Sequence, residues 1–249
     1  MMDATRAEVC AVACADSWRD AGEVLASPFG LIPALGARLA RLTTAPDLLL
    51  TDGEAVLLAE PPPLGRESEA ATAEGWMPYR RVLDLLAGGR RRVMMGATQL
   101  DRHGNQNISR IGPWERPKVQ LIGVRGAPGN SVNHVTNYWV PKHGERTFVE
   151  RVDLVCGVGH DRATGAAGRF HDVRVVVTDL AVLDFAGPDR TMRLRSVHPG
   201  TTVREVQERT GFELDTSAVA ETRVPTGEEL ELIRGRLDPD GLRHREVPA

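Results

Sequence analysis

Apolar residues recur every three or four positions in three segments of the first hundred residues. This spacing predicts amphipathic helices over 4–18, 33–42 and 78–87. Pro33 and Pro78 stand where the second and third of these helices would begin. A helix start tolerates proline because the first helical N–H groups have no partner within the helix.

Short apolar runs between and beyond these helices predict strands. The runs are residues 48–50, 93–95, 119–122, 152–155 and 173–177. Thr202 with Glu205, and Thr226 with Glu229, have the spacing of capping boxes that would start two further helices. Because strands and helices alternate, we expect an α/β fold with a largely parallel sheet flanked by helices. A chain of 249 residues can form this fold as a single domain, 1–249.

Charge and cysteine usage exclude several function classes. The formal net charge of -3 gives no general attraction to nucleic acid, and no apolar stretch reaches the ~18 residues of a membrane span. Cys10, Cys14 and Cys156 are an odd number, which argues against a disulfide framework and favours a cytoplasmic protein. Cys10 and Cys14 share a helical face without a nearby His or Cys to complete a metal site, so we interpret them as core residues.

The predicted strands also indicate where a ligand would bind. In open α/β sheets the ligand crevice lies beyond the carboxyl ends of the strands. That rule selects the loops after Leu50, Met95 and Ile122.

Three motifs carry a resemblance to a known family. They are GATQLDRHGNQN at 96–107, VVTDLAVLDF at 176–185 and HPGTTVREVQERTGFEL at 198–214. In this order and spacing they resemble the β subunits of class I coenzyme A transferases. The resemblance implies the CoA transferase-like fold, which is similar to that of sugar-phosphate isomerases. It also implies an α-type partner subunit in an α2β2 heterotetramer, and a CoA thioester substrate with no separate cofactor or metal.

One departure from the family falls on the turn after Leu50. Transferases have Ser-Glu-Asn-Gly there, with the glutamate attacking the thioester, whereas this chain has Thr51-Asp52-Gly53-Glu54. Asp52 is one methylene shorter than glutamate, and ~1 Å of misplacement can cost about a hundredfold in rate. A two-residue shift in alignment would instead bring Glu54 to the nucleophile's position. Both carboxylates therefore remain candidate catalytic residues.

The second departure is the glycine-rich loop and the segment after it, residues 123–139. By resemblance, the glycines would offer N–H groups to the thioester oxygen and let the CoA arm approach closely. The polar residues that follow could bind a carboxylated or keto-bearing ring, although Asn also suits a helix start. His134 is more easily explained by structure, and Arg125 and Arg151 are weaker candidates for phosphate or carboxylate binding. The candidate substrate-binding residues are Gly123, Gly126, Gly129, Asn130, Asn133 and Tyr138.

These departures favour a transferase-like branch of the family that degrades steroid rings. The implied reaction adds water to a keto-cyclohexene-bearing CoA thioester and opens its ring, with the main base on the α partner. An ordinary CoA transferase remains the alternative, and a CoA-thioester-binding module without catalysis is a second. All these interpretations expect the turn after Leu50 and the glycines near Gly126 to meet in one crevice that a partner completes.

Overall fold

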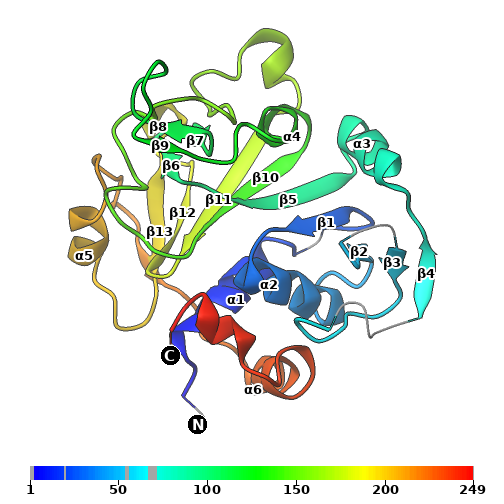
Figure 1. The fold of residues 1–249 in the computed structure, drawn as a ribbon. Helices are drawn as coiled ribbons and strands as arrows, with labels where there is room; N and C mark the ends of the chain where they lie inside the picture. The colour runs from blue at the N-terminus through cyan, green and yellow to red at the C-terminus, as the bar shows by residue number, and fades with distance from the viewer. Residues whose placement is uncertain (1–2, 20, 54–55, 67–71, 249) are drawn as a thin grey trace. The chain divides into compact units, whose positions relative to one another are not determined.

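The computed structural model describes residues 3–19, 21–53, 56–66 and 72–248. Within it the chain forms two compact units (Figure 1). Unit 1 consists of Met1–Met94 and Thr222–Ala249, and unit 2 consists of Met95–Glu221. This division leaves the prediction of one domain over 1–249 untested.

Unit 1 is built on two packed helices, α1 (Arg6–Asp16) and α2 (Leu31–Leu42). They approach closely at Gly36, where an added Cβ would lie 2.7 Å from the Cβ of Cys14. Cys10 and Cys14 are both buried and neither forms a disulfide bond, as expected of core residues. The helix predicted over 33–42 begins earlier than expected, because Gly30 rather than a residue beside Pro33 caps it.

A buried ion cluster ties α1 to the end of the chain. Thr5 and Glu8 form a capping box, and the Glu8 carboxylate also accepts hydrogen bonds from Arg234 Nε at 2.7 Å and Arg243 Nη2 at 3.0 Å. Arg243 in turn donates to Asp238. The arginines come from the C-terminal segment, which comprises α6 (Gly227–Glu231), a π-helix at Leu232–Leu237 and a 3-10 turn at Leu242–Arg245.

The strands of unit 1 form two groups. β1 (Leu25–Pro28) pairs in parallel with β5 (Arg91–Gly96), and Leu25 also bridges in parallel to Leu49. The second group is an antiparallel sheet in the order β2-β3-β4. Its strands are β2 (Leu50–Thr51), β3 (Val56–Leu58) and β4 (Ala73–Trp76). Helix α3 (Tyr79–Ala87) follows β4, with Pro78 as its N-cap as the sequence indicated.

The main strands of unit 2 combine parallel and antiparallel pairs. β10 (Val135–Val140) is parallel to β11 (Asp172–Thr178), and β13 (Arg193–Val197) is parallel to β14 (Ala220–Glu221). β12 (Ala181–Asp184) runs antiparallel to its neighbours β11 and β13, to which it is joined by short connections. With the β1–β5 pair of unit 1, the parallel pairs outnumber the antiparallel pairs of β12, and the prediction of a largely parallel sheet with flanking helices is confirmed.

Shorter elements complete unit 2. Two small antiparallel pairs are formed by β6 (Gln99–Leu100) with β7 (Gln106–Asn107), and by β8 (Arg110–Ile111) with β9 (Val119–Gln120). The helical elements are α4 (Ala127–Asn133), α5 (Val203–Glu208) and the 3-10 turns η1 (Gly165–Gly168) and η2 (Pro188–Arg190). None of the described helices of either unit has both the length and the apolar character that crossing a bilayer requires.

Two strand predictions need correction. Residues 152–155 form no strand, because side chains replace the ladder: Asp153 N–H donates to Gln99 Oε1, and its carboxylate accepts from Gly112 N–H. The strand predicted over 119–122 is shortened to β9, an exposed strand paired only with β8 in the described sheets. Of the predicted capping boxes, Thr226–Glu229 is complete, whereas Thr202 alone caps α5.

Candidate functional site

The turn after Leu50 is a β-hairpin held by Asp52. The Asp52 N–H donates to the Val56 carbonyl at 3.1 Å, and the Asp52 carboxylate accepts from Val56 N–H at 3.0 Å. Gly53 follows with φ of +90°, a conformation that favours glycine. One carboxylate oxygen of Asp52 thus supports its own hairpin, and Glu54 lies outside the described residues.

The glycine-rich loop belongs to unit 2 and leads into α4. Gly123 has φ of +79°, and an added Cβ there would have no neighbour within 4 Å, so the backbone is accessible to a ligand. Arg125 holds a left-handed conformation at φ of 48°, and Gly126 caps α4. Among the described residues the amides of Arg125 and Gly126 donate to no acceptor. They are therefore available to an oxyanion.

The two asparagines of α4 have different surroundings. Asn130 is buried, and its side-chain amide donates to Met95 Sδ at 3.1 Å, at the end of β5. Asn133 is partly exposed, and its amide turns back to donate to the Gly129 carbonyl at 2.7 Å. These bonds hold α4, the helix that follows the glycine loop, which fits the structural interpretation of both side chains as well as the binding one.

Tyr138 and His134 lie further from solvent than a substrate-binding role requires. The Tyr138 hydroxyl is fully buried and donates to the Gly104 carbonyl at 3.3 Å, and burial raises its pKa. His134 is buried too, with Nδ1 3.1 Å from the Val135 carbonyl oxygen. Binding roles for these residues stay predictions.

The Gly96–Asn107 motif builds a buried polar network rather than a reactive centre. The Asp101 carboxylate accepts from the backbone N–H groups of His103 and Asn105 and from the Asn105 side chain at 2.9 Å. Burial raises the pKa of Asp101, while the bonds from Asn105 and His103 oppose that rise. Asn105 also accepts from the Gly159 N–H at 2.8 Å. The motif therefore fixes the β6–β7 hairpin against the loop before η1.

The C-terminal motifs meet at a single buried imidazole. His143 Nδ1 lies 3.2 Å from the Thr178 hydroxyl oxygen, and Nε2 lies 2.9 Å from that of Thr210. The ring stacks on Phe148 at 4.1 Å between centroids. Burial, reinforced by the charge of Arg209, lowers the pKa of His143 to about 3. The family motifs thus share a neutral histidine that the sequence did not single out.

Asn137 on β10 is a further residue that the sequence did not single out. It is 1% exposed, and neither polar atom of its side-chain amide has a hydrogen-bond partner among the described residues. An unpaired buried polar group costs about 1–3 kcal/mol. No set of three His, Cys, Asp or Glu residues in the described part of the chain is arranged to hold a metal ion.

Comparison with known proteins identifies the family that shares this combination of motifs and fold. The coenzyme A transferase family matches residues 21–209 of the chain. This chain belongs to the coenzyme A transferase family. The resemblance inferred from the three motifs is therefore confirmed.

Relatives of two kinds within the coenzyme A transferase family are similar to this chain. The cholesterol ring-cleaving hydrolase IpdB subunit of Mycobacterium tuberculosis is 56% identical over 98% of both chains. The crystal structure of Rhodococcus jostii IpdAB superposes with a TM-score of 0.95 and 54% identity over 100% of both chains. One of the subunits of a 3-oxoadipate CoA-transferase from Pseudomonas knackmussii is 33% identical over 82% of both chains.

The described geometry leaves the roles of the predicted site residues untested. The Asp52 turn belongs to unit 1, and the loop with Gly123, Gly126 and Gly129 belongs to unit 2. The Asp52 turn follows β2 and the glycine loop follows β9, and both strands lie in small antiparallel sheets rather than in the parallel sheet to which the crevice rule applies. Their meeting in one crevice stays a prediction.

Proposed function

We propose that this chain is the β-type subunit of a two-subunit hydrolase that opens a ring of a cholesterol-derived CoA thioester. The observation that carries the proposal is the 56% identity with a ring-cleaving hydrolase subunit over 98% of both chains. The 3-oxoadipate CoA-transferase subunit has only 33% sequence identity, over 82% of both chains. Because both branches share the fold, the higher identity over nearly the whole chain is what favours the hydrolytic branch.

The α-type partner would supply the principal base and complete an α2β2 assembly. The accessible amides of Arg125 and Gly126 would stabilise negative charge on the thioester oxygen, because N–H donors fixed before the reaction need no reorganisation. Coenzyme A enters as part of the substrate, and no separate cofactor is required. Three buried cysteines that form no disulfide bond agree with a reducing compartment, so we place the protein in the cytoplasm.

Asp52 suits this reaction better than it suits a covalent transfer. A transferase nucleophile must have a carboxylate oxygen free to attack the thioester carbonyl. Asp52 is shorter than glutamate, and one of its carboxylate oxygens accepts the Val56 N–H, which ties the side chain to its own hairpin. We assign Asp52 a supporting role, as the residue that shapes the turn and adds negative charge beside the partner's base.

Product analysis tests the proposal against acyl exchange. The chain and its α-type partner are incubated with a keto-cyclohexene-bearing CoA thioester, with and without an acceptor acid, and the products are weighed by mass spectrometry. Ring opening adds the mass of one water and leaves CoA attached, whereas transferase chemistry moves CoA to the acceptor. Borohydride supplies the second readout: a reduced thioester adduct on Asp52 or Glu54 would favour the transferase alternative.

The non-catalytic alternative makes a different prediction for the same mixture. A binding module would retain the CoA thioester unchanged with or without the α-type chain. Asp52→Glu provides the matched variant, since it restores the transferase side chain in the same hairpin. We expect this variant to keep ring opening as the main reaction, because the rest of the site is unchanged.

A further inference from the structure

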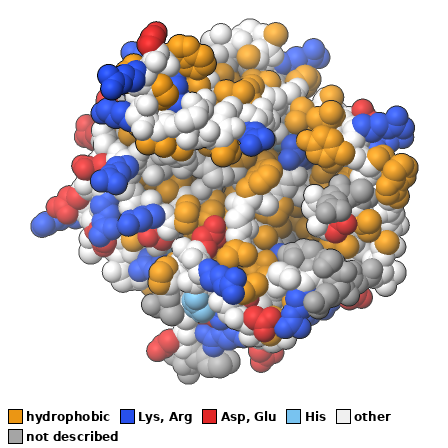
Figure 2. Space-filling view, in the orientation of Figure 1, with side chains coloured by type: hydrophobic (Ala, Val, Ile, Leu, Met, Phe, Trp, Pro, Cys, Tyr) orange, Lys and Arg blue, Asp and Glu red, His pale blue; other side chains and the backbone are white. Residues whose placement is uncertain are grey.

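Helix α3 is amphipathic, yet none of its side chains is buried. Tyr79 and Leu83 lie one turn apart on the same face and are 74% and 54% exposed. Trp76, at the end of β4 three residues earlier, is 76% exposed. We name these three residues the apolar stripe. In the space-filling view, hydrophobic side chains gather over α3 and β4 (Figure 2).

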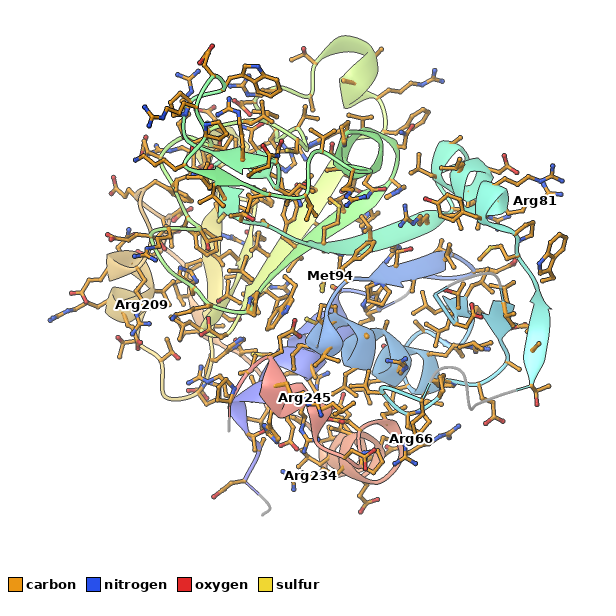
Figure 3. The ribbon with its side chains drawn as sticks, viewed as in Figure 1. Arg66, Arg81, Met94, Arg209, Arg234 and Arg245 are labelled. Carbon is orange, nitrogen blue, oxygen red and sulfur yellow. The ribbon has the colours of Figure 1, made fainter. Side chains whose placement is uncertain are left out.

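The charges of this segment lie beside the stripe rather than on it. Arg81 and Asp84 form an exposed pair at 3.3 Å on the other side of α3, where Arg81 extends outward (Figure 3). The exposed charged residues of 79–90 are three arginines and one aspartate, Arg80, Arg81, Arg90 and Asp84. An apolar centre rich in aromatic residues with a charged rim is the composition of a protein–protein interface.

The register of the small antiparallel sheet places the stripe next to the candidate site. Trp76 is the cross-strand partner of Val56, and Val56 in turn exchanges hydrogen bonds with Asp52 across the hairpin. Adjacent strands lie about 4.8 Å apart, so Trp76 stands about 10 Å from the Asp52 turn. β4 is also the outer strand of the described β2-β3-β4 sheet.

We propose that the apolar stripe is the docking surface for the α-type subunit and brings that subunit against the Asp52 turn. The inference rests on the proposed function, because it requires a site shared by two chains. Trp and Tyr dominate binding energy where they are buried at the centre of an interface.

Charge favours the α-type subunit over a second copy of this chain. In a symmetric dimer built on the stripe, the exposed arginines of residues 79–90 would face the same arginines of the other copy, and like charges would meet. A different chain can present an acidic rim to these arginines. We therefore expect the contacting face of the α-type subunit to be apolar at its centre and acidic around it.

The decisive experiment measures association of the full chain with the α-type subunit of IpdAB. The double variant Trp76→Asp/Tyr79→Asp introduces charge into the stripe, and Tyr79→Ala is the milder change. Phe170→Asp in unit 2 is the matched control, since Phe170 is a similarly exposed aromatic residue, 56% accessible. Binding is measured by interferometry, and assembly mass by mass photometry.

We expect the double variant to bind the α-type subunit at least ~30-fold more weakly than the wild type, and Phe170→Asp to bind it unchanged. Circular dichroism and the melting temperature of the isolated chain should not fall, because the altered side chains are exposed. Binding within about twofold of wild type in the double variant would overturn the inference. A double variant that still binds the α-type subunit but no longer associates with copies of its own chain would also overturn the inference. A wild-type chain that binds no α-type subunit would contradict the proposed function itself.

Discussion

Buried His143 should make the stability of this protein depend on pH in the range where exposed groups contribute little. The Thr210 hydroxyl already donates to the Val206 carbonyl at 2.8 Å, so it accepts the Nε2–H of His143. Nδ1 then faces the Thr178 hydroxyl, and the folded imidazole is neutral. Protonation would place a positive charge in a buried position near Arg209. Burial is the larger cause of the lowered His143 pKa, and the charge of Arg209 is the second.

The size of the effect follows from the two pKa values. The folded pKa is about 3, and an unfolded histidine has a pKa of about 6.5. The unfolded state therefore binds a proton that the folded state rejects, and stability falls as pH drops below about 6.5. Between about pH 7.5 and about pH 5.5 this single group should cost about 1.4 kcal/mol.

Urea unfolding followed by tryptophan fluorescence measures this loss in the wild type and in His143→Gln. Glutamine can keep a hydrogen bond to Thr210 but cannot titrate. We expect the wild type to lose about 1.4 kcal/mol more than the variant between the two pH values, although the variant starts from lower stability. Phe212→Leu is the control: it alters the ring that contacts Phe148, so stability should fall while the pH dependence stays. Equal pH dependence in the wild type and His143→Gln would refute the neutral buried histidine.

Three further variants test the packing and the site. Gly36→Ala would place a Cβ 2.7 Å from the Cys14 Cβ, so the free energy of unfolding should fall by about 1–3 kcal/mol. Gly235→Ala is the control, since its added Cβ would meet no atom within 4 Å and should be tolerated. Burial would raise the pKa of Glu8, but the Arg234 hydrogen bond and other contacts lower it to about 2. The stability that the Glu8 carboxylate contributes is therefore present above about pH 4.5 and is lost as pH falls toward 2. Glu8→Gln should lower the free energy of unfolding, measured in urea, by about 3–5 kcal/mol. Tyr138→Phe should lower stability by about 1 kcal/mol without changing KM; a raised KM at unchanged stability would instead support the predicted binding role.

The helices could be predicted because their signals are local. Pro78 and Gly88 bound α3 as the sequence indicates, and Thr226 with Glu229 forms the expected capping box. Each signal depends on backbone groups within one turn of the residue that satisfies them, so no long-range information is needed. The family could be identified for a similar reason, since its motifs are contiguous segments.

The missed features depend on contacts between distant segments. Residues 152–155 have the composition of a strand, but the side chain of Gln99 binds the backbone of Asp153 and replaces the ladder. The sequence around Glu8 does not indicate its ion cluster, because its arginine partners lie 226 and 235 residues away. The periodicity of α3 predicted a buried face, whereas its apolar side chains are partly or largely exposed in the chain alone. Pattern indicates an apolar face but does not say which molecule covers it.

The motifs that identify the family and the residues that would choose its reaction are therefore different sets. Asp101 and Asn105 shape a hairpin, and Thr178 with Thr210 encloses a neutral histidine, so these motifs preserve the fold whatever the chemistry. The Asp52 hairpin can change its side chain without disturbing either network. A family can accordingly keep its scaffold while replacing a covalent nucleophile, and the reaction must be inferred from the turn and its partner subunit rather than from the motifs.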